Sequence, residues 1–199
     1  MTLYFVRHGE TEWNAQKKIQ GKTDIPLNEK GLHQSKLLAD ELRDSRLGVV
    51  RIYTSPYLRA AQTAQIIADE LNAECIPLED LREMDLGEWE GSNWNRIKET
   101  YGDAYHYWNT HRRFTNTPGG ECYNDVLRRA LKAFETILRQ ETEDTIVVSH
   151  SAVLMAVRCY LSCLPFEEMA KRFKTQNAEA VKLDSEELMR AIDRFSAGE

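Results

Sequence analysis

Four side chains could bind an anion: Arg7, His8 and His150 stand where apolar runs of this sequence end, and Arg59 follows shortly after the end of another run. The runs, at residues 2–6, 49–54 and 145–149, have the composition of buried strands. In an open α/β sheet, ligands bind outside the carboxyl ends of the strands, so side chains far apart in sequence could meet there. Planar guanidinium groups bind phosphoryl oxygens in pairs, which makes a phosphoryl group the expected guest.

The elements that must position these residues alternate along the chain. Further strand-like runs occupy 74–77 and 178–183, and apolar residues recur at helical spacing in 58–71, 127–138 and 153–164. Asn28 is a suitable N-cap for another helix that extends to about Arg43, and Pro56 suits the first turn of the helix that carries Arg59. Strands that alternate with helices imply a mostly parallel central sheet with right-handed crossovers. The predicted fold is therefore α/β, a three-layer α/β/α sandwich.

Residues 79–120 interrupt this alternation. They contain no convincing strand and are rich in Trp, Tyr, Arg and Glu. We expect them to form a small helical or loop cap over the carboxyl ends of the strands. The length of 199 residues suits a single domain, 1–199, that includes this insertion.

The composition argues against several classes of protein. The formal charge of −6 disfavours general nucleic-acid binding but not a small anionic substrate, because the local field of a pocket outweighs net charge. No apolar run is long enough to cross a membrane, and the first residues do not resemble a signal peptide. The cysteines form no metal-type pair, although Cys159 and Cys163 would share a helix face. A cytoplasmic protein with reduced thiols is predicted, and its oligomeric state is left open.

The motif Arg7-His8-Gly9-Glu10-Thr11 resembles the Arg-His-Gly signature of the histidine phosphatase (phosphoglycerate mutase-like) superfamily. The resemblance continues, in the order of that family, through Asn14 and the segments 20–27, 55–64, 81–91, 118–121 and 148–150. A tripeptide alone is a weak signal, but several spaced motifs in one order are specific. The resemblance implies a member of the phosphatase branch of this superfamily.

The resemblance also implies roles for individual residues. His8 matches the nucleophile that forms a phosphohistidine, while Arg7, Arg59 and His150 would stabilise the transferred phosphoryl group. Glu83 matches the acid that protonates the leaving oxygen and later activates water. Further phosphate-binding positions are Asn14, Thr11, Gln20, Gly21 and Ser151. No metal or other cofactor is implied, because the arginines supply the charge that a Mg²⁺ ion would otherwise provide.

Two positions depart from the family pattern. Ser151 stands where Gly usually follows the second histidine, which leaves the local geometry open, and Cys122 stands where Ser is common. Two of the phosphate-binding assignments also have a simpler interpretation. Asn14 and Thr11 could contact phosphate or could serve only loop and N-cap hydrogen bonds.

Several cap side chains could contact a substrate or could simply pack the cap onto the sheet. The aromatic ones are Trp89, Trp94, Tyr105, Tyr107 and Trp108. Arg112 and Arg113 could reach an anionic tail of a substrate, although a solvated helix end is the simpler interpretation. The other histidines, His33, His106 and His111, are expected to be ordinary surface or packing residues.

A metal-independent phosphomonoesterase that acts on a small phosphorylated metabolite is the favoured function. A mutase must exclude water, and family mutases carry long insertions, whereas only 34 residues separate Glu83 from Pro118. The chain also lacks the Arg-Arg-Ser segment with prolines that is associated with the mutases. A cofactor-dependent phosphoglycerate mutase and a non-catalytic regulator that binds phosphorylated ligands are the alternatives. The substrate stays open among sugar phosphates, phosphoserine, phosphoglycerates and a cobamide-precursor phosphate.

Overall fold

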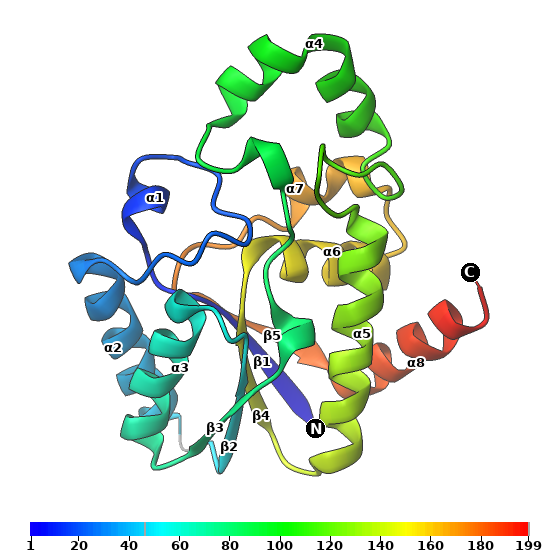
Figure 1. Cartoon of the computed structure of the whole chain (residues 1–199). Coiled ribbons are helices and arrows are strands. Elements are labelled where there is room, and N and C mark those ends of the chain that lie inside the picture. The colour runs from blue at the N-terminus through cyan, green and yellow to red at the C-terminus, as the bar shows by residue number, and fades with distance from the viewer. Residues whose placement is uncertain (46, 199) are drawn as a thin grey trace.

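The computed structural model describes residues 1–45 and 47–198, so residues 46 and 199 of the predicted domain lie outside the described part. Its centre is a five-stranded sheet in the order β3-β2-β4-β1-β5 (Figure 1). The strands are β1 (Thr2–Arg7), β2 (Arg51–Thr54), β3 (Glu74–Pro77), β4 (Thr145–Ser149) and β5 (Ala180–Asp184). Every pairing is parallel except that of β5, which runs antiparallel to β1. The carboxyl ends of β1, β2 and β4 therefore meet at one edge.

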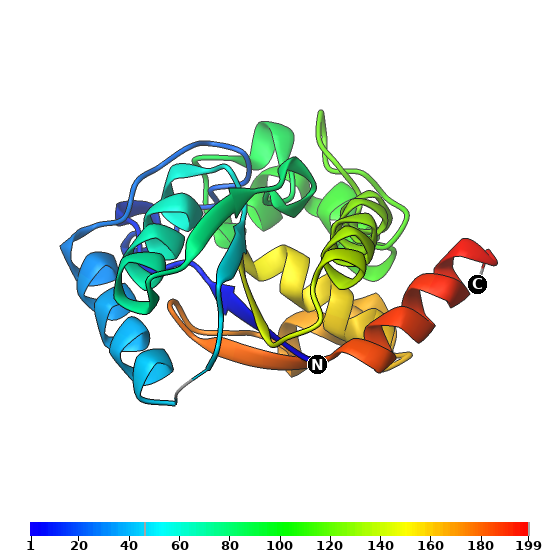
Figure 2. The same ribbon diagram turned by 90° about the horizontal axis from the view of Figure 1, so that it is seen from below.

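Helices cover both faces of this sheet. The longer ones are α2 (Glu29–Asp44), α3 (Leu58–Leu71), α4 (Trp94–Thr110), α5 (Tyr123–Gln140), α6 (Ser151–Leu161) and α8 (Ser185–Ser196). The short ones are α1 (Glu12–Ala15), α7 (Met169–Arg172) and the 3₁₀ turns η1 (Glu79–Leu81), η2 (Gly87–Trp89) and η3 (Phe166–Glu168). Figure 2 shows α2 and α3 on one face and α5, α6 and α8 on the other. The predicted three-layer sandwich is confirmed.

Side chains of the central strands alternate between the two faces of the sheet. On β1, Phe5 packs into the core beneath α5 and α6, while Val6 packs into the core beneath α2 and α3. On β4, Val147 and Val148 divide in the same way. All four are fully buried, as expected for strands covered on both faces. Polar residues are thereby confined to the ends of these strands, where the site lies.

Local sequence signals set most element ends. The Asn28 side chain accepts a hydrogen bond from Gly31 N at 2.8 Å and caps α2, as predicted. The predicted bounds of β3 and β4 coincide with the observed ones.

The helix α6 is shorter than predicted. It ends at Leu161, and Cys163 beyond it has a left-handed φ of 52°. The prediction that Cys163 shares a helix face with Cys159 is wrong.

Residues 79–120, all of which the structure describes, form no strand. The first part of this segment runs beside α5, and α4 then arches over the edge of the sheet (Figure 1). The arch has two helical limbs because Gly102 interrupts α4 with φ 42° and ψ −111°. Gly tolerates that backbone conformation since it has no Cβ. That 79–120 is an insertion into a single domain stays a prediction.

Three further observations concern membrane-spanning helices, metal sites and the cysteines. Within the described ranges, no helix is long and apolar enough to cross a membrane. Nor does that part of the chain place three or more His, Cys, Asp or Glu side chains so that they could hold a metal ion. The four cysteines are free thiols. The cytoplasmic location stays a prediction.

Candidate active site

His8 follows the last residue of β1, and its ring is held with one nitrogen free. Its backbone N–H donates to Ser149 O at 3.1 Å, which joins the ends of β1 and β4. Nδ1 lies 2.7 Å from Gly9 O, and because a carbonyl can only accept, Nδ1 carries the proton. Nε2 then keeps its lone pair and has no hydrogen bond to the described residues. The side chain is only 2% exposed and lines a cavity at this edge.

Burial and charge keep this imidazole neutral. Burial lowers the pKa of His8 well below its usual value of 6.5, and the nearby guanidinium groups of Arg59 and Arg7 lower it further. The hydrogen bond to Gly9 O opposes this shift but does not cancel it. A neutral imidazole with a free nitrogen is the form that can attack phosphorus.

His150 follows the last residue of β4, with its ring centroid 5.2 Å from that of His8. Its Nε2 lies 2.7 Å from Ser55 Oγ, which also accepts from Tyr57 N at 3.3 Å. The Ser55 hydroxyl can therefore direct its proton to Nε2, which leaves the proton of the imidazole on Nδ1. That Nδ1 is buried without a partner among the described residues, so it is free to donate to a ligand. Burial, followed by the charge of Arg59, lowers the pKa of His150 well below 6.5.

Ser55 is a site residue for which no role was expected from the sequence. It follows β2 directly, just as His8 follows β1 and His150 follows β4. A polar residue at a third strand end is the signal that could have identified it.

Arg59 lies in the first turn of α3, and its side chain is fully buried. Nη1 donates to Thr23 O at 2.9 Å and Nη2 donates to Gly21 O at 2.8 Å. Neutral carbonyls thus orient the guanidinium, and no carboxylate of the described residues forms an ion pair with it. Its positive charge is therefore available to an anion in the cavity.

Arg7 and the loop before β5 complete the cationic side of the site. Arg7 Nη1 donates to Thr175 O, and its buried Nε has no partner within the described part of the chain. From the same loop, Asn177 Nδ2 donates to His8 O at 3.0 Å and to Asn14 Oδ1 at 3.1 Å. This loop approaches the site only in three dimensions, and nothing in the local sequence of Asn177 indicates its role.

Glu83 presents a carboxyl group with a raised pKa to the same cavity. Its Oε1 accepts from Met84 N at 2.9 Å, and Oε2 lies 3.5 Å from Ala152 N. Burial raises the pKa of Glu83 above 4.5, although the Met84 amide and the charge of Arg59 act in the opposite direction. A carboxyl group of this kind can hold a proton for a leaving group.

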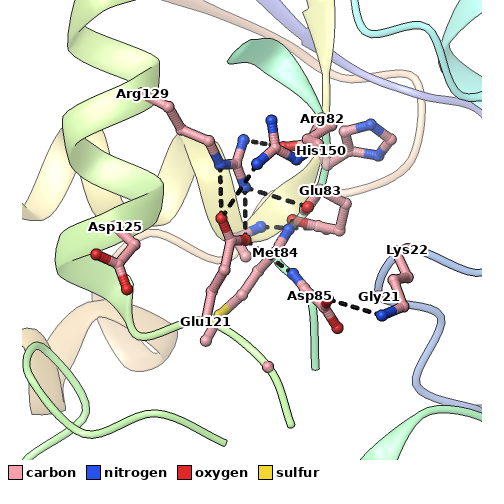
Figure 3. A network of polar contacts seen from close by, with 12 residues as sticks. Gly21, Lys22, Arg82, Glu83, Met84, Asp85, Glu121, Asp125, Arg129 and His150 are labelled. Atoms are coloured by element: carbon pink, nitrogen blue, oxygen red, sulfur yellow. Dashed lines mark hydrogen bonds and ion pairs between the residues drawn. The ribbon is translucent and has the colours of Figure 1, made fainter. Parts of the chain in front are cut away.

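Arg129 on α5 braces the segment that carries Glu83 (Figure 3). Its Nε and Nη2 each donate to the Glu121 carboxylate at 3.0 Å, and Nη2 also donates to Glu83 O at 3.1 Å. The same carboxylate accepts from Asp85 N at 2.9 Å. The irregular backbone is therefore tied down on both sides of Glu83. No sequence signal distinguishes Arg129 from its exposed neighbour Arg128.

Removal of the Arg129 guanidinium is expected to destabilise the fold. Arg129→Met should lower the free energy of unfolding by about 3–5 kcal/mol, because the mostly buried Glu121 would lose two hydrogen bonds and keep only its longer ion pair with Arg82, at 3.6 Å. Arg128→Met is the matched control, since Arg128 is exposed, pairs with Asp125 at 2.9 Å and should contribute about 0–1 kcal/mol. Chemical denaturation measures both. Equal losses of free energy in the two variants would show that the contacts of Arg129 stabilise the fold no more than the surface ion pair of Arg128.

Glu90 holds the loop at residues 21–23 in place, and the carbonyl groups of this loop orient Arg59. One of its carboxylate oxygens accepts from Lys22 N at 2.9 Å. The Lys22 side chain reaches the neighbouring segment through an ion pair with Asp85 at 2.8 Å (Figure 3). Gly21 approaches so closely, with φ +54°, that a Cβ would lie 2.0 Å from Glu90 Oε1. A role for Glu90 was not expected from the sequence, although it belongs to one of the family-like segments.

A cavity of about 200 Å³ brings most of the predicted site residues together. Those on its wall are Arg7, His8, Asn14, Gln20, Gly21, Arg59, Glu83 and Ser151. His150 is not on the wall, but its ring contacts that of His8. Thr11 is not on the wall either, because its hydroxyl accepts from Asn14 N at 3.1 Å and donates to Gln20 Oε1 at 2.9 Å. Thr11 thus caps α1, which was the simpler interpretation.

Ser151 causes no strain where the family usually has glycine. It is the first residue of α6, and its φ is not in the left-handed region that favours glycine. Ser151 and Ala152 line the cavity, so the N-terminus of this eleven-residue helix lies against it. The positive end of the helix dipole favours a bound anion there, although the N–H of Ala152 already faces the Glu83 carboxyl at 3.5 Å.

Similarity to known proteins identifies the family. The sequence model of the histidine phosphatase superfamily (branch 1) matches residues 3–197. The chain belongs to this superfamily. Its relatives include phosphoserine phosphatase 1 of Hydrogenobacter thermophilus, 36% identical over 160 residues that cover 80% of this chain and 75% of the relative. A probable phosphoglycerate mutase of Serratia proteamaculans is 31% identical over 192 residues, which cover 94% of this chain and 86% of the relative.

A solved structure gives the same answer for the fold. Bacillus stearothermophilus YhfR has a TM-score of 0.81 at 31% identity, over 92% of this chain and 90% of that chain. The predicted fold class and the resemblance to the histidine phosphatases are confirmed. The predicted enzyme class, a phosphoric monoester hydrolase, is confirmed at the level of the family.

Proposed function

We propose that this histidine phosphatase hydrolyses a phosphate monoester of a small metabolite through a phosphohistidine on His8. The observation that carries the proposal is the neutral imidazole of His8, whose free Nε2 shares a cavity with two guanidinium groups and a carboxyl of raised pKa. These groups are a nucleophile, charge stabilisers and an acid, which together suffice for phosphoryl transfer.

In the first step, the Nε2 lone pair of His8 attacks phosphorus and the bond to the leaving oxygen breaks. Arg7, Arg59 and the Nδ1–H of His150 stabilise the charge on the three equatorial oxygens. Glu83 donates its carboxyl proton to the leaving oxygen, so the alcohol departs neutral. The other residues that bind phosphate in this proposal are Asn14, Gln20, Gly21 and Ser151, while Thr11 supports Gln20.

In the second step, water hydrolyses the phosphohistidine. Glu83, now a carboxylate, takes a proton from water as the water oxygen attacks phosphorus. The N–P bond breaks, its electron pair returns to Nε2 of His8, and inorganic phosphate leaves. Both side chains are then in their starting protonation states.

The reaction needs no metal ion in this proposal. Neither Arg7 nor Arg59 forms an ion pair with a described residue, so both charges are available to the phosphoryl oxygens. Hydrolysis of p-nitrophenyl phosphate should therefore be unchanged by EDTA. Vanadate should inhibit it, since vanadate adopts the trigonal-bipyramidal geometry of in-line transfer. Complete loss on chelation, restored by Mg²⁺, would contradict this charge assignment.

A phosphoglycerate mutase is the second candidate, favoured by the Serratia relative of that name. A mutase must keep water from the phosphohistidine, whereas the space next to the site reaches solvent at the exposed residues Trp94 and Lys174. Incubation with 3-phosphoglycerate and a trace of 2,3-bisphosphoglycerate, which would phosphorylate His8 of a mutase, separates the two, because a hydrolase releases phosphate and a mutase forms 2-phosphoglycerate. Absence of turnover with this substrate and with p-nitrophenyl phosphate would favour the third alternative, a regulator that only binds.

A further inference from the structure

A second cavity, of about 440 Å³, adjoins the phosphate-binding cavity beneath α4. The two cavities share five wall residues: Arg7, Trp94, Tyr123, Ser151 and Met155. A phosphate monoester with its phosphorus at His8 would therefore extend its alcohol portion into this space, which we call the cap cavity.

The cap cavity is cationic although the chain is acidic. Arg7, Arg112 and Lys174 line it, and no Asp or Glu of the described residues does. The formal charge of the chain is −6, so composition does not account for this local sign. A concave surface of one sign concentrates ligands of the opposite sign.

Arg112 is the decisive member of this set. Its side chain is buried, with the residue 7% exposed, so the expectation of a solvated helix end is wrong for Arg112. Nε donates to Asn109 O at 3.2 Å, Nη2 donates to Asn109 Oδ1, and the guanidinium lies 4.9 Å from the ring centre of Trp108. In the described ranges it forms no ion pair. A buried guanidinium with only neutral partners is unfavourable, and an anion in the cavity would compensate its charge.

Besides Asn109 and Ser151, the rest of the wall is aromatic or apolar. Trp94 and Trp108 stack with their ring centroids 5.7 Å apart and their planes at 15°. Trp94 is 41% exposed even though it lines both cavities, and Tyr105 and Met155 extend the apolar surface. An apolar or planar body between the phosphate and a second anion would bury its surface here.

We propose that the cap cavity is a subsite for an anionic group on the leaving alcohol, which Arg112 and Lys174 bind. The substrate class is a phosphate monoester whose alcohol has an apolar or planar body and ends in a carboxylate or a second phosphoryl group. Guanidinium groups bind both anions in pairs of hydrogen bonds. The assignment rests on the phosphomonoesterase function proposed for the site.

Two aryl phosphates of equal shape test the subsite. 4-Carboxyphenyl phosphate has an anion where 4-carbamoylphenyl phosphate has a neutral amide. The wild-type kcat/KM should be about 10- to 100-fold higher for the carboxylate, the range for hydrogen bonds to a buried charge. The amide withdraws more electron density, so leaving-group chemistry alone favours the opposite order. 4-(Phosphonomethyl)phenyl phosphate in the same assay separates a preference for phosphoryl groups from one for carboxylates.

Variants of Arg112 and Lys174 test whether these residues cause the preference for the carboxylate ester. Arg112→Met should lower the ratio of the two kcat/KM values to about 1–3, and Lys174→Met should lower it severalfold. Arg113→Met and Lys171→Met are the controls and should keep the wild-type ratio, because neither residue lines the cap cavity. Thermal denaturation checks that each variant folds. Lys174 is exposed, so its variant tests the subsite even where Arg112→Met does not fold.

The outcomes separate this inference from the function on which it rests. A wild-type ratio near 1, with both esters hydrolysed, would overturn the subsite and leave the proposed function intact. A large ratio that neither Arg112→Met nor Lys174→Met lowers would overturn the assignment of these residues. Hydrolysis of neither ester by the wild type would overturn the proposed function itself.

Discussion

Replacement of His8 by alanine should lower kcat for every phosphate monoester by on the order of 10⁵-fold or more, because the covalent route is lost. Gly9 O occupies Nδ1, so Nε2 is the nitrogen that can form the bond to phosphorus. The neighbouring guanidinium groups stay protonated and cannot act as nucleophiles in its place. Turnover of p-nitrophenyl phosphate and of an alkyl phosphate measures the loss.

A trapping experiment identifies the atom that carries the phosphoryl group. Quenching without acid, with labelled substrate, should yield an adduct on His8 that is stable in alkali and labile in acid. His33→Ala is the control, since His33 is exposed on α2 and not on the cavity wall, and it should retain both label and turnover. An adduct on Ser151 or on any cysteine would refute the mechanism.

Glu83→Gln should slow hydrolysis of an alkyl phosphate by about 10²–10⁴-fold and cost far less with p-nitrophenyl phosphate. An alkoxide leaves poorly without a proton, whereas p-nitrophenolate leaves without help. The comparison holds when hydrolysis of the phosphohistidine is not rate-limiting. Glu79→Gln is the control, because Glu79 is exposed and does not line the cavity. Equal losses on both esters would instead assign Glu83 to positioning or water activation.

The same assignment determines the direction of the pH dependence. The acid works only when protonated, so kcat/KM for the alkyl phosphate should fall as pH rises through the raised pKa of Glu83. His8 must be neutral, and its lowered pKa keeps it neutral well below pH 6.5, so activity should persist into acidic solution. Glu83→Gln should remove the alkaline decline for this substrate. Persistence of that decline in the variant would show that another group causes it.

By itself, the sequence determined the strands, the residues at their ends and the family. Apolar runs with a polar residue at the end are a local signal, and parallel strands bring their carboxyl ends to one edge. His8 and His150 were therefore expected to meet, and their rings lie 5.2 Å apart. Glu83 had no such signal in periodicity, and its assignment came from the family-like segment 81–91.

Only the tertiary structure decided which partners these residues have. Ser55 orients His150, Asn177 reaches His8 O from 169 positions away, and Arg129 holds the backbone of Glu83. The strand-end position of Ser55 is a local signal for the site, but the three contacts themselves have none, because each depends on which loops and helices meet once the sheet has formed.

Dependence on tertiary structure also explains why the expectation that Arg112 is solvated was wrong. In sequence it resembles the exposed end of a helix, but the second limb of α4 packs it against Trp108. Asn109 and Trp108 are close to Arg112 in sequence, but whether Arg112 faces solvent or a cavity depends on the other cavity walls, which are distant along the chain. Sequence therefore predicted where the chemistry occurs, while tertiary packing decided the protonation state of His8 and the cationic character of the cap cavity.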